Sequence, residues 1–353
     1  MHNQENKLKK QIIEILFLVV LIGVTFYCYM RGYSFDNLWT VLKNANVFYL
    51  TAGVSMMLLF ICCEAVNIHL IMKTLGQNIP LHRCIQYSGI GFYFSSITPS
   101  ASGGQPAQIY YMRKDKISVP MSSLTIFYIV FVYQISMILI GIVMSCMRFS
   151  IFLYFLHRIP YLFVFGFVVN TTVIFLLSLL MFSNNWPPRI IHFITILLSK
   201  LHFNNRTNKF EDKMEKGISS YREKVMILKQ YPVLFFKVLF VTMIQMLSLT
   251  LIPALVYRCM GYNTFHIIDL ITCQSLLTIS VSAIPLPGAE GISQGGFLQI
   301  YDMFFQKNAI ISAMLIHRVL SFYLPLILCF LLTMATHIRI AKQDSRGDNC
   351  ERK

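Results

Sequence analysis

Long runs of apolar residues alternate with short polar segments along most of the chain. Apolar residues make up 56% of the sequence and charged residues 13%, whereas soluble domains carry about 25% charged residues. A helix needs about 20 mainly apolar residues to cross the hydrocarbon core of a bilayer. The pattern therefore predicts an all-α polytopic membrane protein with about six full spans, near 12–30, 46–70, 121–147, 160–182, 232–257 and 309–335.

Two further apolar segments, 84–110 and 267–303, are interrupted by proline and glycine. The interruptions read SSITPSASGGQP in the first segment and SAIPLPGAEGISQGG in the second. Proline lacks the backbone N–H that a continuing helix needs. Lipid cannot satisfy the backbone groups that a broken helix exposes, so such a segment must be buried in protein or line a wet cavity. We expect each to form a broken re-entrant helical hairpin.

The distribution of lysine and arginine favours re-entry over crossing. If both hairpins re-enter, the basic segment 183–231 and the basic tail 341–353 lie in the cytoplasm; if both cross, 183–231 lies outside, against the positive-inside rule. Re-entry divides the membrane region into two repeats, 1–150 and 151–340, each with three spans and one hairpin and of opposite orientation. Inverted repeats of this kind are common in carriers. We expect a multi-pass plasma-membrane protein with both termini in the cytoplasm.

The insert 183–231 is not expected to form a domain. Apolar residues recur there at steps of three and four from Phe210 to Leu228, with lysine, arginine and glutamate on the other faces. This spacing predicts an amphipathic cytoplasmic helix on the inner leaflet or beneath the spans, and a simple connector is the alternative. The net charge of +15 is suited to anionic lipid headgroups, and no compact basic domain for nucleic acid is evident.

Candidate site residues are concentrated in the two hairpins. Glycine permits close approach and unusual backbone angles, hydroxyl and amide groups add polarity without charge, and a helix N-terminus after Pro106 could hold a phosphate. A kink satisfied by neighbouring helices is the alternative. The candidate substrate-binding residues of the first hairpin are Thr98, Pro99, Ser102, Gly103, Gly104, Gln105, Pro106, Tyr110 and Arg113. Those of the second are Pro287, Gly288, Glu290, Gly291, Gln294 and Gly295.

Two acidic residues fall within segments expected to lie in the membrane, where a charge is costly and marks a functional hypothesis. We expect Glu290 to pair with Arg318, unless it is solvated at the outer interface. We expect Glu64 to pair with a cationic headgroup, unless it forms a structural hydrogen bond between spans. No nucleotide-binding, metal, cofactor or catalytic motif is present. Transport of any substrate would therefore be either downhill or driven by an ion or proton gradient, and in the second case Glu290 or Glu64 would be the first candidate for coupling.

Three motifs in order carry a resemblance to a known family: ITPSASGGQPAQIYYMRK (97–114), PLPGAEGISQGGF (285–297) and HRVLSFYLPLIL (317–328). Together they resemble the flippase-like transmembrane region of bacterial lysylphosphatidylglycerol synthase, also called multiple peptide resistance factor. The resemblance covers nearly the whole chain. It implies a lipid translocase that moves an aminoacylated or related phospholipid, such as lysyl-phosphatidylglycerol, between leaflets and so contributes to resistance against cationic antimicrobial peptides. Relatives often carry an acid where this chain has Gln294, whereas the acid here is Glu290.

The resemblance further implies a stand-alone form without the soluble aminoacyltransferase domain, and hence no catalysis by this chain on its own. Three alternatives remain open. The chain could be the membrane component of a phosphatidylglycerol lysyltransferase with a separate soluble synthase partner, a carrier for a soluble solute, or a non-transporting partner of a lipid- or glycan-assembly enzyme. A cavity sealed from lipid would favour the solute carrier. The expected partners are phospholipid and membrane, not nucleic acid, and a homo-oligomer is also open.

Overall fold

The computed structural model describes residues 43, 45–182, 220–221 and 223–351. This part of the chain is helical, and five of its helices are long and apolar enough to cross a membrane: Val47–Thr74, Val119–Met147, Pro160–Met181, Pro232–Cys259 and Ile310–Ile340. They agree with five of the six predicted spans, so the chain is a polytopic helical membrane protein. The predicted span near 12–30 and most of the predicted amphipathic insert lie outside the described residues.

The elements have the following bounds in chain order: α3 (Val47–Thr74), α4 (Leu81–Ile97), η1 (Pro99–Ala101), α5 (Gly104–Lys114), α6 (Val119–Met147), α7 (Phe149–Arg158), α8 (Pro160–Phe182), α11 (Pro232–Thr250), α12 (Ile252–Cys259), α13 (Ile267–Val281), η2 (Pro287–Ala289), α14 (Ile292–Ile300), η3 (Tyr301–Met303), α15 (Ile310–Arg318), η4 (Val319–Tyr323) and α16 (Leu324–Glu351). Two spans contain a break. Pro253 removes a backbone N–H at the start of α12, and the π-helical turn η4 joins α15 to α16. Such π-turns are frequent at functional sites.

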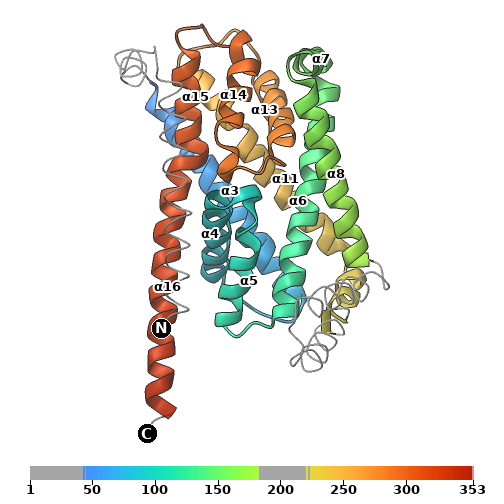
Figure 1. The fold of residues 1–353 in the computed structure, drawn as a ribbon, viewed down its shortest axis with the longest axis vertical. Coiled ribbons are helices and arrows are strands. Elements are labelled where there is room, and N and C mark those ends of the chain that lie inside the picture. Colours follow the sequence, from blue (N-terminus) through green and yellow to red (C-terminus); the bar gives the residue numbers. More distant parts are fainter. Residues whose placement is uncertain (1–42, 44, 183–219, 222, 352–353) are drawn as a thin grey trace, which may run out of the picture.

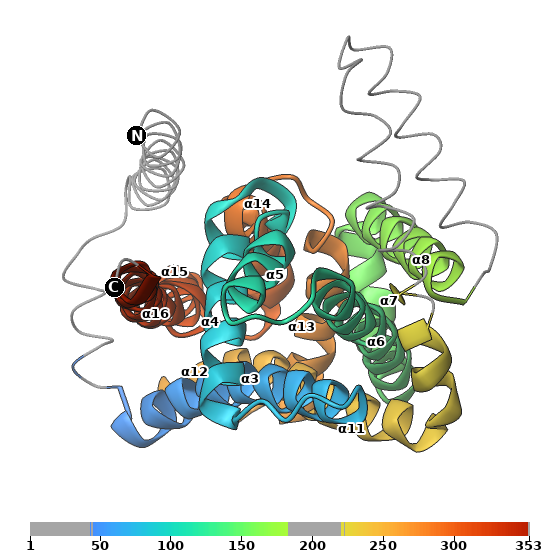
Figure 2. The ribbon, with the colours of Figure 1, turned by 90° about the horizontal axis from the view of Figure 1, so that it is seen from below.

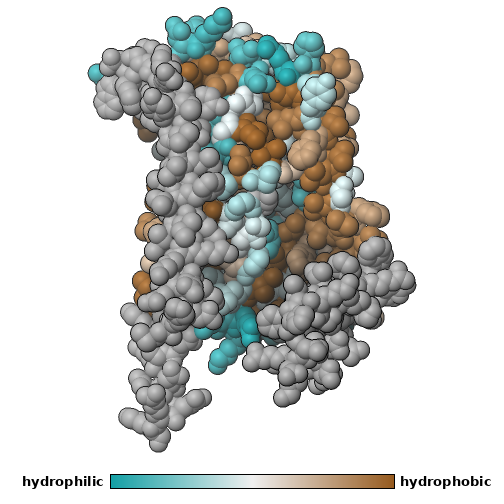
Figure 3. Space-filling model, viewed as in Figure 1, coloured by the Kyte–Doolittle hydropathy of each residue, from teal (hydrophilic) through white to brown (hydrophobic). Residues whose placement is uncertain are grey.

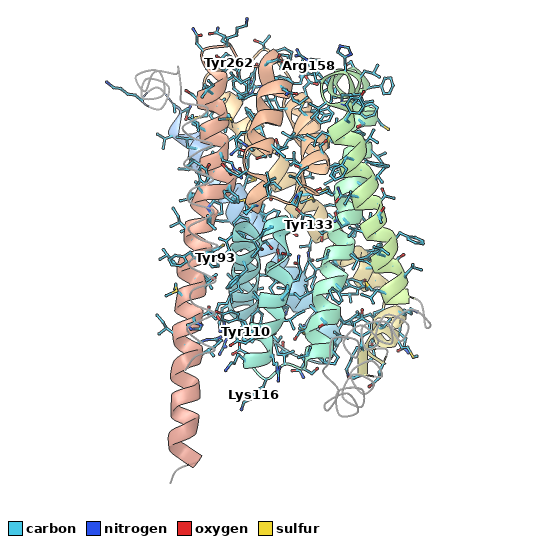
Figure 4. All side chains as sticks on the ribbon, in the orientation of Figure 1. Tyr93, Tyr110, Lys116, Tyr133, Arg158 and Tyr262 are labelled. Atoms are coloured by element: carbon cyan, nitrogen blue, oxygen red, sulfur yellow. The ribbon has the colours of Figure 1, made fainter. Side chains whose placement is uncertain are left out.

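The two segments expected to be broken hairpins do fold back on themselves (Figure 1). One consists of α4, η1 and α5, and the other of α13, η2 and α14. The first hairpin begins and ends toward the end of the molecule that carries Lys116, and the second toward the opposite end, which carries Arg158 and Tyr262 (Figure 4). Their tips, η1 and η2, contact each other at mid-height. The hairpins thus point in opposite directions, as in the inverted repeat, which stays a prediction.

The hairpins are held between long helices. In the view along the long axis, α5 and α14 lie on one side of the bundle and α3 and α11 on the other (Figure 2). The first hairpin packs through α4 against α3 and α16, and the second packs through α13 against α6 and α8. Helix α8 exposes large apolar side chains, among them Phe165, Val168 and Phe175. Exposed apolar side chains on a long apolar helix are expected where it faces lipid.

Glycines allow the closest helix contacts, as is common in membrane bundles. A Cβ on Gly104 of α5 would lie 2.7 Å from the carbonyl oxygen of Gly91 in α4. A Cβ on Gly166 of α8 would lie 2.7 Å from Ser280 Cα and would overlap the carbonyl oxygen of Ile279. In both places the obstacles include backbone atoms, which cannot move aside as a side chain can.

We expect Gly166→Ala to destabilise the protein, because α8 would have to move away from α13. Overpacking costs about 1–3 kcal/mol, which outweighs the roughly 1 kcal/mol that alanine gains over glycine in a helix. The matched control is Gly53→Ala, where the added Cβ would meet only the end of the Leu320 side chain, at 2.9 Å. Thermal unfolding in mild detergent should therefore show a lower midpoint for Gly166→Ala alone. Equal midpoints for the two variants would contradict the close contact.

Candidate functional site

A cavity of about 930 Å³ lies between the hairpin tips and helices α3, α6 and α8. Its volume is within the range of about 300–1,000 Å³ typical of ligand sites. Tyr133, labelled at mid-height in Figure 4, belongs to its wall. Glu64 is the one charged residue in the described lining. The other polar groups of the lining are hydroxyls and amides from both hairpins and from the long helices: Ser95, Ser96, Ser102, Gln105, Gln108, Gln134, Asn170, Thr278, Ser282 and Ser321.

The cavity reaches the side of the molecule at the first hairpin tip. Ser102 and Pro106 line the cavity and are exposed. Pro106 shares one face of α5 with Tyr110 and Arg113, which are exposed and do not line the cavity, because residues three and four apart lie on the same side of a helix. The outer face of α5 therefore forms an edge of the cavity.

Glu64 is held on the cavity wall by a residue of the first hairpin. Gln108 donates through Nε2 to Glu64 Oε1 at 2.7 Å and to the carbonyl oxygen of Tyr87 at 3.2 Å. The amide reaches across α4 at Gly91, where a Cβ would overlap it. Glu64 thus accepts a structural hydrogen bond from the first hairpin and not from another span, and it also faces the cavity.

Glu290 forms a buried ion pair with Arg318 near the second tip. Glu290 is 1% exposed, so it is not solvated at an interface. Arg318 Nε donates to Glu290 Oε2 at 3.0 Å, and Nη2 donates to the same oxygen and, at 2.6 Å, to the carbonyl oxygen of Gly288. Tyr323 donates to Glu290 Oε1 at 2.8 Å, and the Gln294 amide donates to the same atom. Both carboxylate oxygens are therefore satisfied, as a buried charge requires.

A smaller cavity of about 160 Å³ adjoins this ion pair. Arg318, Gln294 and His317 line it, and His317 Nε2 is buried without a hydrogen-bond partner among the described residues. Thr278 and Gly288 line both this cavity and the large one. The two cavities are therefore adjacent, and residues of the second hairpin line both.

The first tip differs in detail from the sequence prediction. Helix α5 begins at Gly104, so Pro106 lies in its first turn, and the predicted helix start after Pro106 is wrong. Gly103 has φ −84°, and the residue with unusual positive φ is Ala101, at 54°. Gly103 and Gly104 therefore serve close approach, not unusual backbone angles. The Gly103 N–H donates to Thr98 Oγ1 at 2.9 Å, which closes the turn.

Three residues of the second tip have positive φ: Gly288 at 57°, Ala289 at 50° and Gly291 at 84°. Side chains disfavour this region of backbone space, and glycine populates it readily. Residues held in such conformations cluster at binding sites and switches. Ala101 and Ala289 place one non-glycine positive φ in each tip, where η1 and η2 meet.

The structure gathers some of the sequence-predicted site residues and leaves others beside the cavities. Glu64, Ser102, Gln105, Pro106 and Gly288 line the large cavity. Gly288, Gln294 and Arg318 line the smaller one. The lining of either cavity does not include Thr98, Pro99, Gly103, Gly104, Tyr110, Arg113, Pro287, Glu290, Gly291 or Gly295.

Sequence reasoning missed several lining residues in the spans. Asn170 of α8 donates through Nδ2 to the carbonyl oxygen of Ile279 at 3.1 Å and to Ser282 Oγ at 2.8 Å. Asn170 thereby joins a lipid-facing helix to the second hairpin. The sequence could have indicated Asn170, because an amide within an apolar span usually forms a hydrogen bond with a neighbouring helix. Within the described residues, no group of three or more histidine, cysteine or acidic side chains could hold a metal ion.

Comparison with known proteins places this architecture in a family. A "UPF0104 membrane protein" of Archaeoglobus fulgidus is 23% identical over 302 residues, which cover 82% of this chain and 88% of that protein. Residues 11–329 match the family described as the lysylphosphatidylglycerol synthase TM region. This match contains both hairpins, both cavities and the ion pair between Glu290 and Arg318. The chain therefore belongs to the lysylphosphatidylglycerol synthase transmembrane-region family.

Proposed function

We propose that this protein moves a phospholipid between the two leaflets of its membrane. The observation that carries the proposal is the large cavity at mid-height, where the tips of two opposed broken hairpins meet. Irregular backbone at membrane depth is tolerated only in protein or at a water-filled cavity. In carriers with inverted repeats, substrates bind where broken helices meet near the midplane.

The position of the cavity favours a lipid over a soluble solute. A lipid must keep its acyl chains in the bilayer while its headgroup is solvated by protein, which requires access from the side. Ser102 and Pro106 belong both to the cavity lining and to the exposed face of the first hairpin. Because the family is named for lysylphosphatidylglycerol synthase, lysyl-phosphatidylglycerol is the first substrate to test.

The orientation in the membrane is also a proposal. The end of the molecule that carries Lys116 also bears Arg113 and Lys114, and α16 extends past it toward the C-terminus. Basic residues are enriched in cytoplasmic loops. This end is therefore the cytoplasmic side, and the first hairpin enters from it.

Filling the cavity should stop lipid movement. Liposomes would carry lysyl-phosphatidylglycerol in the inner leaflet, and an impermeant amine-reactive dye outside would report its arrival over time. We expect the wild type to expose the lipid faster than protein-free liposomes. Val173 of α8 lines the cavity, so Val173→Trp should slow lipid exposure at least about tenfold, which corresponds to about 1.4 kcal/mol in the barrier.

The matched control is Val168→Trp, the same substitution on the same helix at a residue that is 55% exposed and outside the lining. It should retain the wild-type rate. Folded wild-type protein that exposes no lipid above the protein-free rate would reject movement of this lipid. Equal rates for Val173→Trp and the wild type would remove the cavity from the route.

A further inference from the structure

The first hairpin presents a polar face to the outside of the bundle. Ser102, Pro106, Tyr110 and Arg113 are exposed, and Tyr110 is 48% exposed. Their spacing of four, four and three residues puts them on one side of α5 and its N-terminal turn. This face runs from the hairpin tip at mid-height to the end of the molecule that carries Lys116.

The second hairpin presents a matching face. Gly295 is half-buried, and Gln299 and Asp302 are exposed. The spacing of four and three residues again places them on one side of α14 and the following turn η3. This face runs from the second tip to the end of the molecule that carries Arg158.

The two faces join into one surface, which we call the polar stripe and define as Ser102, Pro106, Tyr110, Arg113, Gly295, Gln299 and Asp302. Figure 3 shows a pale to teal band in this region, which runs from one end of the molecule to the other over α5 and α14. On its right the surface over α6 and α8 is brown, hence apolar. Helix α16, on its other side, exposes Ile327, Leu331 and Ile338.

Such a band is unusual on a surface that crosses the bilayer. Helix α8 shows the ordinary solution, which is a face of phenylalanine and valine. Polar groups placed against hydrocarbon cost free energy unless water or another polar group meets them. The stripe therefore indicates that something polar passes over the hairpins at membrane depth.

The chemistry of the stripe is graded along its length. The middle is uncharged, with a hydroxyl at Ser102 beside the glycine-rich tips. One end carries Arg113, and the other carries Asp302, which pairs with Arg158 at 2.9 Å and accepts from Tyr154 at 2.5 Å. Partial burial and the hydrogen bond to Asp302 raise the pKa of Tyr154, so this group stays a neutral donor. A cationic end attracts a lipid phosphate, and an uncharged middle lets it move on.

We propose that the polar stripe is the track along which the phosphate-bearing headgroup of a phospholipid crosses the membrane, with its acyl chains in the bilayer beside it. This inference rests on the proposed function and names its route. Ser102 and Pro106 belong to both the stripe and the cavity lining, so the cavity is a resting place beside the track at mid-height.

Spin labels test the track without any transport assay. Single cysteines would replace Ser102, Tyr110 and Gln299 of the stripe, on a background in which Cys28, Cys62, Cys146 and Cys350 are serine and which takes up no label by itself. Control cysteines would replace Val168 of α8 and Leu331 of α16, which are 55% and 57% exposed. In phospholipid vesicles, collisions would be measured with oxygen, with a soluble nickel chelate, and with a lipid whose headgroup carries chelated nickel.

Stripe labels should collide with the nickel lipid several-fold more often than control labels, and control labels should collide mainly with oxygen. Labels at the stripe that behave like the controls would overturn the track, because acyl chains would cover it. Labels that reach no probe would overturn it as well, since protein such as segment 12–30 or a second copy would cover the stripe. Stripe labels that collide with the soluble nickel chelate but not with the nickel lipid would overturn the track too, because the stripe would then be a water-filled groove and not a route for headgroups.

The two proposals fail separately. Wild-type protein that does not move lysyl-phosphatidylglycerol in the liposome assay rejects the proposed function for this lipid, whatever the labels report. If the wild type moves the lipid but the stripe labels behave like the control labels, the proposed function is kept and the route is confined to the cavity.

Discussion

Glu290→Leu should lower the free energy of unfolding by about 3–5 kcal/mol, which is the usual cost of removing one partner of a buried ion pair. Arg318 is 8% exposed and would keep its charge after losing the carboxylate that faces it, with the Gly288 carbonyl oxygen still accepting from Nη2. The donors Tyr323 and Gln294 would also lose their acceptor. We expect little folded protein after purification and a much lower midpoint of thermal unfolding in mild detergent.

An exposed ion pair provides the control for Glu290→Leu. Asp302 and Arg158 form a pair at 2.9 Å whose side chains are 41% and 42% exposed. Exposed pairs contribute about 0–1 kcal/mol, so Asp302→Asn should unfold close to the wild-type midpoint. If both variants lost stability equally, burial would not be what makes the Glu290 pair important.

A double variant separates stability from function at the same place. An apolar pair of similar volume often replaces a buried ion pair without loss of stability, so Glu290→Leu with Arg318→Met should recover much of the folded yield. The pair adjoins the smaller cavity and the second hairpin tip. A folded double variant that no longer moves lipid would assign the pair to transport, and one that moves lipid normally would leave it a structural role.

The spans and the hairpins could be predicted because their signals are local. Twenty apolar residues have the length of a span whatever their neighbours are, and proline breaks a helix wherever it occurs. The direction of the hairpins depended on counting lysine and arginine over whole loops. Glu290 and Arg318 could be expected to pair because opposite charges in membrane segments have few other partners.

Partners set by tertiary packing could not be predicted in this way. Gln108 meets Glu64, 44 residues away, because α4 and α5 are close enough for the amide to pass at Gly91. The positive φ at Ala101 likewise lies where two tips far apart in the chain meet. Tyr110 and Arg113 on the outer face of α5 were predicted as substrate-binding residues but do not line the cavity. Periodicity shows which residues share a face and not what that face contacts.

Glu64→Gln should slow the movement of lysyl-phosphatidylglycerol by about 10- to 100-fold while phosphatidylglycerol is little affected. Glu64 is the one charged group in the described cavity lining, and a hydrogen bond to a charged group contributes about 1.5–3 kcal/mol. Glutamine keeps the size of the side chain and an oxygen that accepts from Gln108, so the wall of the cavity should stay in place. The loss should therefore depend on the positive charge of the headgroup.

The matched control for Glu64→Gln is Glu223→Gln, which makes the same chemical change at a side chain that is 68% exposed and outside the cavity lining. It should move both lipids at the wild-type rate. Phosphatidylglycerol has no amine for the dye to react with. Its movement would therefore be followed with an impermeant enzyme that modifies phosphatidylglycerol. Equal slowing of both lipids by Glu64→Gln would make the carboxylate a support for the first hairpin through Gln108. An unchanged rate for lysyl-phosphatidylglycerol would mean that its headgroup does not meet Glu64 and passes along the polar stripe alone.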